Sequence, residues 1–181
     1  MCQETLEEVM ASIDFPIYGL TEEVFGLRSS GYWAPPRYNG KYWSCPKDQL
    51  CITLNYQSDR YMPFIHKKSS KETTFSVCNG RSLRDGEPLL GIKYASYVRW
   101  EEGPDLPVSE GKRTFAFCSS LTIDGEQFVG NFLYFPAPIF HSIYVFNHGH
   151  LCLQGQARGP HPDELIQILE SLHVLNGKAV E

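Results

Sequence analysis

The fold is decided by one stretch, Thr114–Ala157, which reads TFAFCSSLTIDGEQFVGNFLYFPAPIFHSIYVFNHGHLCLQGQA. Asp124-Gly125 separates two runs of alternating apolar residues, and a central Asp-Gly pair is typical of a two-residue hairpin because both residues tolerate positive φ. Pro136 and Pro138 end the second run, since proline cannot donate to a sheet ladder. Asn147-His148-Gly149 then separates a third run from a fourth. The stretch predicts four consecutive antiparallel strands.

Alternation within these strands assigns side chains to faces, because successive residues of a strand point to opposite sides of the sheet. Leu121 and Ile123 share one face of the first strand with Phe115 and Phe117. On the second strand one face carries Phe128, Phe132 and Tyr134, and the other carries Val129, Leu133 and Phe135.

The flanking sequence predicts a helix near each end of the chain. Leu6, Val9, Met10 and Ile13 follow helical spacing and predict a helix over 4–13. Pro162 suits a first helical position, and an apolar stripe predicts a second helix over 163–172. Other predicted elements are strands at 24–29, 49–56, 73–78 and 90–100, a turn at Asn79-Gly80, loops at 30–39 and 101–112, and a short edge strand at 173–175. We therefore expect a single α+β domain over 1–181, a large antiparallel sheet packed by an N-terminal and a C-terminal helix.

Composition excludes several classes of function. The chain is 42% hydrophobic and 20% charged, as in ordinary globular proteins, and its net charge of −5 argues against a nucleic-acid binder. No window reaches the roughly 20 apolar residues of a membrane span, and residues 1–10 lack the basic start of a secretory signal. We expect a cytoplasmic protein, and hence that its six cysteines are free thiols, most of them buried.

Candidate chemistry is sparse. His148 and His150 are two residues apart and could serve as zinc ligands, but no acid flanks them in sequence to orient the imidazoles. Cys118 lies within a strand and gains no helix dipole that would activate it. The sequence has no phosphate-binding glycine loop, nucleophile elbow or nucleotide fingerprint, so we expect no cofactor and no metal.

Aromatic residues gather instead among prolines and glycines after residue 30. Tyr and Trp present large rigid surfaces at low entropic cost and are favoured in recognition sites, although the same residues can simply cover an open end of a sheet. An acidic loop follows later in the chain. The predicted binding residues are Tyr32, Trp33, Tyr38, Tyr42, Trp43, Glu101, Glu102 and Asp105.

The end of the chain resembles one known family. The strand Leu151–Ala157, the proline-led helix 163–172 and the segment Ser171–Leu175 together resemble the close of PsbP-like proteins. That resemblance implies an antiparallel sheet sandwiched by helices and a role as a binding subunit rather than an enzyme.

These observations predict a non-catalytic module that docks to another protein. The acidic composition suits a basic partner, as with immunity proteins, secretion chaperones or accessory subunits. The alternative is a small hydrolase or ligand-binding enzyme with a pocket lined by His141, His150 and Cys118.

Overall fold

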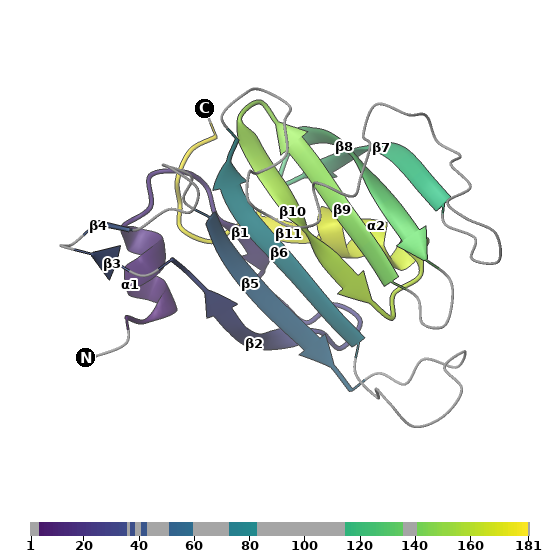
Figure 1. Ribbon diagram of the computed structural model, residues 1–181, viewed down its shortest axis with the longest axis horizontal. Helices are drawn as coiled ribbons and strands as arrows, with labels where there is room; N and C mark the ends of the chain where they lie inside the picture. Colours follow the sequence, from purple (N-terminus) through teal and green to yellow (C-terminus); the bar gives the residue numbers. More distant parts are fainter. Residues whose placement is uncertain are drawn as a thin grey trace.

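The computed structural model describes residues 4–35, 37–38, 41–42, 51–59, 73–82, 115–135 and 141–180, with the backbone alone for 37–38, 41–42, 115–119 and 135. Seven antiparallel strands form the main sheet in the order β2-β5-β6-β10-β9-β8-β7 (Figure 1). Their bounds are β2 (Arg28–Trp33), β5 (Cys51–Ser58), β6 (Thr73–Arg81), β7 (Phe115–Ile123), β8 (Glu126–Phe135), β9 (His141–His148) and β10 (Leu151–Arg158). Two further pairs are β1 (Tyr18–Leu20) with β11 (Leu172–Val174) and β3 (Arg37–Tyr38) with β4 (Lys41–Tyr42).

The four strands predicted from 114–157 are confirmed as β7 to β10, each paired with the next. Asp124 and Gly125 form the first turn, with φ values of 49° and 83°. The predicted second turn is displaced by one residue. His148 still pairs with Leu151 at the end of β9, and the turn is made by Gly149-His150, because Gly149 takes the positive φ of 58°.

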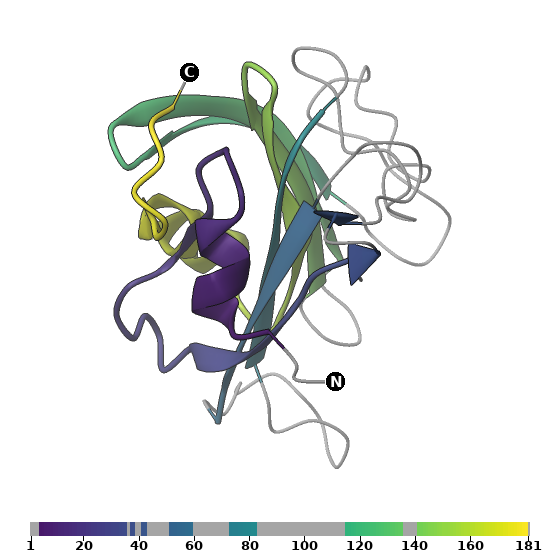
Figure 2. The same cartoon turned by 90° about the vertical axis from the view of Figure 1, so that its left-hand side faces the viewer.

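One face of the sheet, here called the inner face, is apolar and aromatic. Phe75, Phe128 and Tyr144 are buried there within one large hydrophobic cluster. Helix α1 (Leu6–Ala11) adds Val9 to this cluster, and helix α2 (Pro162–Glu170) adds Leu165, Ile168 and Leu169. Figure 2 shows both helices on the same side of the sheet. The α+β prediction is confirmed at the level of fold class.

The β1–β11 pair crosses the inner face and is fastened to it by the side-chain amide of Asn79. The Tyr18 N–H donates to Asn79 Oδ1 at 2.7 Å, and Asn79 Nδ2 donates to the Tyr18 carbonyl at 3.0 Å. The predicted turn at Asn79-Gly80 is therefore wrong. Both residues lie within β6, where a buried amide that satisfies two backbone groups takes the place of a turn residue.

The N-terminal edge of the sheet also differs from prediction. Residues 24–27 form a tight turn closed by the Val24–Leu27 bridge, with positive φ at Phe25 and Gly26, so the strand expected over 24–29 begins only at Arg28. It continues to Trp33, within the segment predicted to be a loop. The structure therefore places Tyr32 and Trp33 on an edge strand. The predicted strand 90–100 lies outside the described residues.

Candidate functional site

Trp33 is the most prominent aromatic side chain on the described surface. It pairs with Thr53 at the end of β2, and 51% of it is exposed. Val129, on β8, is the other large exposed hydrophobic residue in the described part of the chain. An exposed tryptophan buries much apolar area when covered, which makes it a common anchor of protein interfaces.

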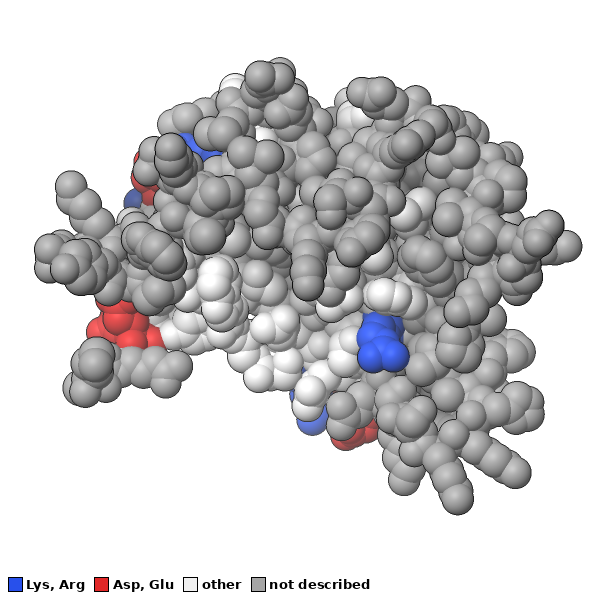
Figure 3. All heavy atoms as spheres, in the orientation of Figure 1, with Lys and Arg blue, Asp and Glu red and all other residues white. Residues whose placement is uncertain are grey.

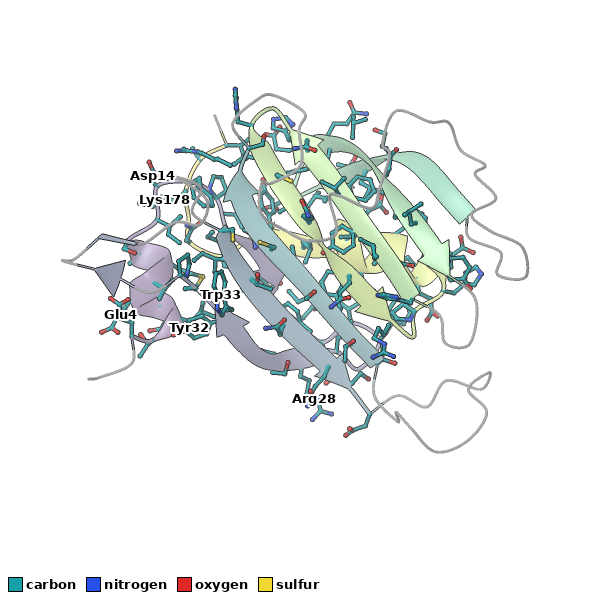
Figure 4. All side chains as sticks on the ribbon, in the orientation of Figure 1. Glu4, Asp14, Arg28, Tyr32, Trp33 and Lys178 are labelled. Atoms are coloured by element: carbon teal, nitrogen blue, oxygen red, sulfur yellow. The ribbon has the colours of Figure 1, made fainter. Side chains whose placement is uncertain are left out.

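Tyr32 holds this end of β2 against α1. Successive strand residues point to opposite faces, so Tyr32 packs against the inner-face core while Trp33 points to the outer side. The Tyr32 hydroxyl donates to the backbone carbonyl of Glu4, just before α1 begins. Figure 4 shows Tyr32, Trp33 and Glu4 together beside α1. The two aromatic residues thus differ, because Tyr32 is partly buried against the core and Trp33 is exposed.

Acidic residues mark the start of α1, the helix whose N-terminal side Tyr32 contacts through Glu4. Thr5 caps the helix, with its N–H donating to Glu8 Oε2 at 2.8 Å and its Oγ1 accepting from the Glu8 N–H at 3.2 Å. This capping box fixes the first turn, and Glu7 and Glu8 suit the positive end of the helix dipole. In Figure 3 the acidic atoms at the α1 end adjoin an uncharged stretch of the described surface. We call Trp33 and Tyr32 on β2, together with Glu4, Glu7 and Glu8 at the start of α1, the Trp33 surface.

The side chains of the other predicted binding residues lie outside the described part of the structure. Tyr38 lies in β3 and Tyr42 in β4, for which the structure describes the backbone. The remaining predicted residues, Trp43, Glu101, Glu102 and Asp105, lie outside the described residues.

The two histidines considered as metal ligands do not form a joint site. The His148 Nδ1 lies 2.8 Å from the Gln127 carbonyl, whereas the His150 Nδ1 lies 3.1 Å from the carbonyl of Ser82, the residue that follows β6. Within the described residues, no group of three or more His, Cys, Asp or Glu side chains is arranged to hold a metal ion.

The residues proposed to line an enzyme pocket are spread across the sheet. His141 pairs with Arg158 at one end of the β9–β10 hairpin, and His150 lies in the turn at the other end. Cys118 lies on β7, where it pairs with Asn131 of β8, and β7 is three strands away from β10. Burial lowers the pKa of His141, which lies 3.2 Å from Gln156 Oε1. The structure brings none of the three together.

Sequence reasoning missed an acid–histidine cluster at the β7–β8 turn. Asp124 accepts hydrogen bonds from the Val174 N–H at 3.0 Å and from His173 Nδ1 at 3.1 Å, and these bonds lower the pKa of Asp124. Glu126 lies 3.5 Å from His148 Nε2, so an acid does flank that imidazole. The register of the β8–β9 hairpin brings Glu126 toward the end of β9, whereas His173 lies on β11, 49 residues from Asp124 in sequence.

Beneath that cluster, the Tyr18 hydroxyl is buried without a hydrogen-bond partner. Burial, with smaller contributions from Glu126 and Asp124, raises the pKa of Tyr18 to about 12. The phenol therefore stays protonated at physiological pH. Its ring packs edge-on against Phe128, with 5.4 Å between the centroids. The cluster connects the β7–β8 hairpin to β11 and lies close to Tyr18 of β1, so we interpret its role as structural.

An open depression on the described surface lies between the 20–23 segment and β5. It is lined by Leu20, Thr21, Glu22, Glu23, Leu27, Arg28, Ser29 and Tyr56. Its ion pair, Arg28 with Glu23 at 3.0 Å, is largely exposed to solvent. No histidine or cysteine is among its lining residues.

Comparison with protein-family models, with curated proteins and with solved structures finds no significant match to this chain. The resemblance of the C-terminal segment to PsbP-like proteins stays a prediction. In the described part of the chain, neither helix has the length and apolar character needed to cross a membrane.

Proposed function

We propose that the protein is a non-catalytic binding module that docks to a basic partner protein through the Trp33 surface. The observation that carries this proposal is the exposed Trp33 side chain on edge strand β2, whose neighbouring Tyr32 donates a hydrogen bond to the Glu4 carbonyl just before the acidic start of α1. The supports of the surface are ordered, since Tyr32 and Leu6 pack against the core. A preformed aromatic anchor loses little entropy when a partner covers it.

The chemistry of the partner follows from the two parts of the surface. Trp33 would enter an apolar socket, and the acidic start of α1 would face lysine or arginine side chains around the rim of that socket. Buried aromatic anchors supply most of the affinity at such interfaces, whereas rim charges mainly increase the association rate and make it sensitive to salt.

Site-specific photocrosslinking tests the proposal because it captures a partner that has not been identified. A benzoylphenylalanine residue is introduced at position 33 and, as the matched control, at Val129, which is 61% exposed on β8. Irradiation in the source cell should give a discrete adduct from position 33 and none from position 129. No adduct at position 33, or the same adducts at both positions, would count against the Trp33 surface.

The electrostatic part of the proposal has its own test on the crosslinked partner. Glu7→Gln should slow association by several-fold at low salt, an effect that disappears near 1 M salt where charges are screened over about 3 Å. The matched control is Glu170→Gln on α2, which removes the same charge from an exposed residue elsewhere. Equal slowing by both variants would contradict a local role for the α1 acids.

A further inference from the structure

Three thiols meet on the outer face of the sheet, the face opposite the aromatic core. Cys51 on β5 and Cys152 on β10 both pair with Gly80 on β6, one from each side. Cys78, two residues before Gly80, pairs with Thr53 on β5 and Gln154 on β10. Because glycine has no side chain, Gly80 does not separate the cysteines, and the three lie next to one another on this face. Cys78, Val145 and Cys152 form a small buried cluster, with Cys51 packed against it.

The three cysteines differ in their access to solvent. Cys51 is partly exposed, while Cys78 is 5% exposed and Cys152 is fully buried. Each carries a thiol rather than a disulfide. An accessible thiol in contact with a buried one is the arrangement found at redox-sensitive cysteine pairs, where the outer thiol reacts first and the inner one resolves the product.

We propose that Cys51 is a site of reversible thiolation, and that Cys78 resolves the adduct into a Cys51–Cys78 disulfide. The co-reactant is a low-molecular-weight disulfide of the glutathione class. This inference is independent of the proposed docking function.

The electrostatics of the pair favour this order of reaction. A hydrogen bond from the Cys78 thiol lowers the pKa of Cys51, against the opposing effect of burial. The same bond and burial raise the pKa of Cys78 well above its usual range, although a hydrogen bond with Thr53 acts in the opposite direction. Cys51 is therefore the more acidic thiol of the pair, and a thiolate is the attacking species in disulfide exchange.

The reaction balances in two exchanges. The Cys51 thiolate attacks one sulfur of RSSR, forming a Cys51–SR bond and releasing RS⁻, which takes up a proton. Cys78 then loses its proton and attacks the Cys51 sulfur, which releases the second RS⁻. Two protein thiols are oxidised to one disulfide, and RSSR is reduced to two RSH. Thiolation also removes the negative charge at Cys51, and with it one of the causes that raise the pKa of Cys78.

The register explains why the disulfide should be reversible. Cys51 and Cys78 are diagonal neighbours on paired strands, and such Cα atoms are typically about 7–8 Å apart. Unstrained disulfides join Cα atoms that are closer than this, so bridging requires a small backbone shift and gives a more reducible bond.

The test is peptide mapping of the folded protein after incubation with oxidised glutathione, without reductant. The wild type should yield a Cys51–Cys78 linked peptide pair that dithiothreitol releases. Cys78→Ser should accumulate glutathione on Cys51, and Cys51→Ser should leave Cys78 unmodified. Cys152→Ser is the matched control and should behave as the wild type.

Several outcomes would overturn the proposal. These are an unmodified Cys51 when other thiols have reacted, a stable glutathione adduct at Cys51 in the wild type, or a bridge from Cys51 to another cysteine. If Cys78→Ser does not fold, as judged by circular dichroism, the wild-type map alone decides. A Cys51–Cys78 peptide pair supports the proposal, and its absence at full oxidation refutes it.

Discussion

The inner and outer faces of the main sheet are built from the same strands but carry different chemistry. The inner face is a continuous apolar layer in which Phe75, Phe128, Tyr144 and Phe146 are almost fully buried. On β5, β6 and β10 the outer face is polar or small, with Thr53, Ser76 and Gln156 on the same face as the three thiols and Trp33 at the β2 edge. On β8 and β9 the same face carries aliphatic residues, namely Val129, Leu133, Ile143 and Val145. One face forms the main hydrophobic core, and the other carries the groups on which both proposals rest.

The difference between the two faces predicts where substitutions should affect stability and where they should affect function. Burial of apolar side chains supplies most of the favourable free energy of folding, so inner-face changes should lower the free energy of unfolding. Outer-face changes at exposed positions should leave the fold intact and reveal any functional role. Two adjacent residues of one strand give the best test of this difference, because they belong to the same backbone segment but their side chains point to opposite faces.

Phe128→Ala should give the largest loss of stability. Phe128 is fully buried and packs against Tyr18, and removing such a side chain typically lowers the free energy of unfolding by about 3–5 kcal/mol. Val129→Ala, one residue along β8 on the other face, should change it by less than about 0.5 kcal/mol. Denaturant unfolding measures both, and similar losses would contradict the division between faces.

Asn79→Ala should have the next largest effect. It leaves the Tyr18 N–H and carbonyl buried without partners, and each unsatisfied group costs about 1–3 kcal/mol, so we expect a loss of about 3 kcal/mol. Asn55→Ala, a partly exposed amide on the outer face of β5, is the matched control and should cost less than about 0.5 kcal/mol. An equally mild effect at Asn79 would show that the β1–β11 pair is held by other contacts.

Asp124→Asn should have a smaller effect, a loss of about 0.5–1 kcal/mol at neutral pH. The bonds to Val174 and His173 favour the charged carboxylate, and solvent screening at this exposed turn keeps their contribution small. Asn tolerates the positive φ of this turn, so the loss of charge is isolated. A lowered folded-state pKa stabilises above the unfolded value of about 3.9 and loses its effect as the pH falls through the folded value.

The measurement for Asp124 is denaturant unfolding at a series of pH values. The gap between wild type and variant should be constant at neutral pH, begin to close near about pH 4 and vanish below the folded-state pKa. Asp59→Asn, at an exposed acid, is the control and should show no such gap. A gap that persists in strong acid would exclude the carboxylate charge as its cause.

Local sequence signals predict the parts of the fold that depend on neighbours in sequence. Asp124-Gly125 indicates the first turn because positive φ is required there, and alternation correctly separates Phe128 from Val129. Pro162 opens α2 as expected. The prediction at Asn79 is wrong because a turn-forming amide and a buried amide that bonds another strand look alike in sequence.

The candidate site is only partly predictable. The residue type of Trp33 is enough to mark it as a candidate binding residue. Its exposure, however, depends on the alternation of β2, which points Tyr32 inward and Trp33 outward. Local composition predicts a loop at this position, so the alternation could not be predicted. The thiol group cannot be predicted, because Cys51, Cys78 and Cys152 become neighbours only through the pairing of β5, β6 and β10. Long-range strand order is set by tertiary packing rather than by local pattern.

The most direct test of this account is to measure affinity and stability on the same preparation of Trp33→Ala. Calorimetric titration against the partner captured at position 33 should show at least about a tenfold loss of affinity, as expected for an aromatic anchor. Denaturant unfolding of the same sample should stay within about 0.5 kcal/mol of the wild type. Unchanged affinity, or a parallel loss of affinity and stability, would contradict a binding role for this edge of the sheet.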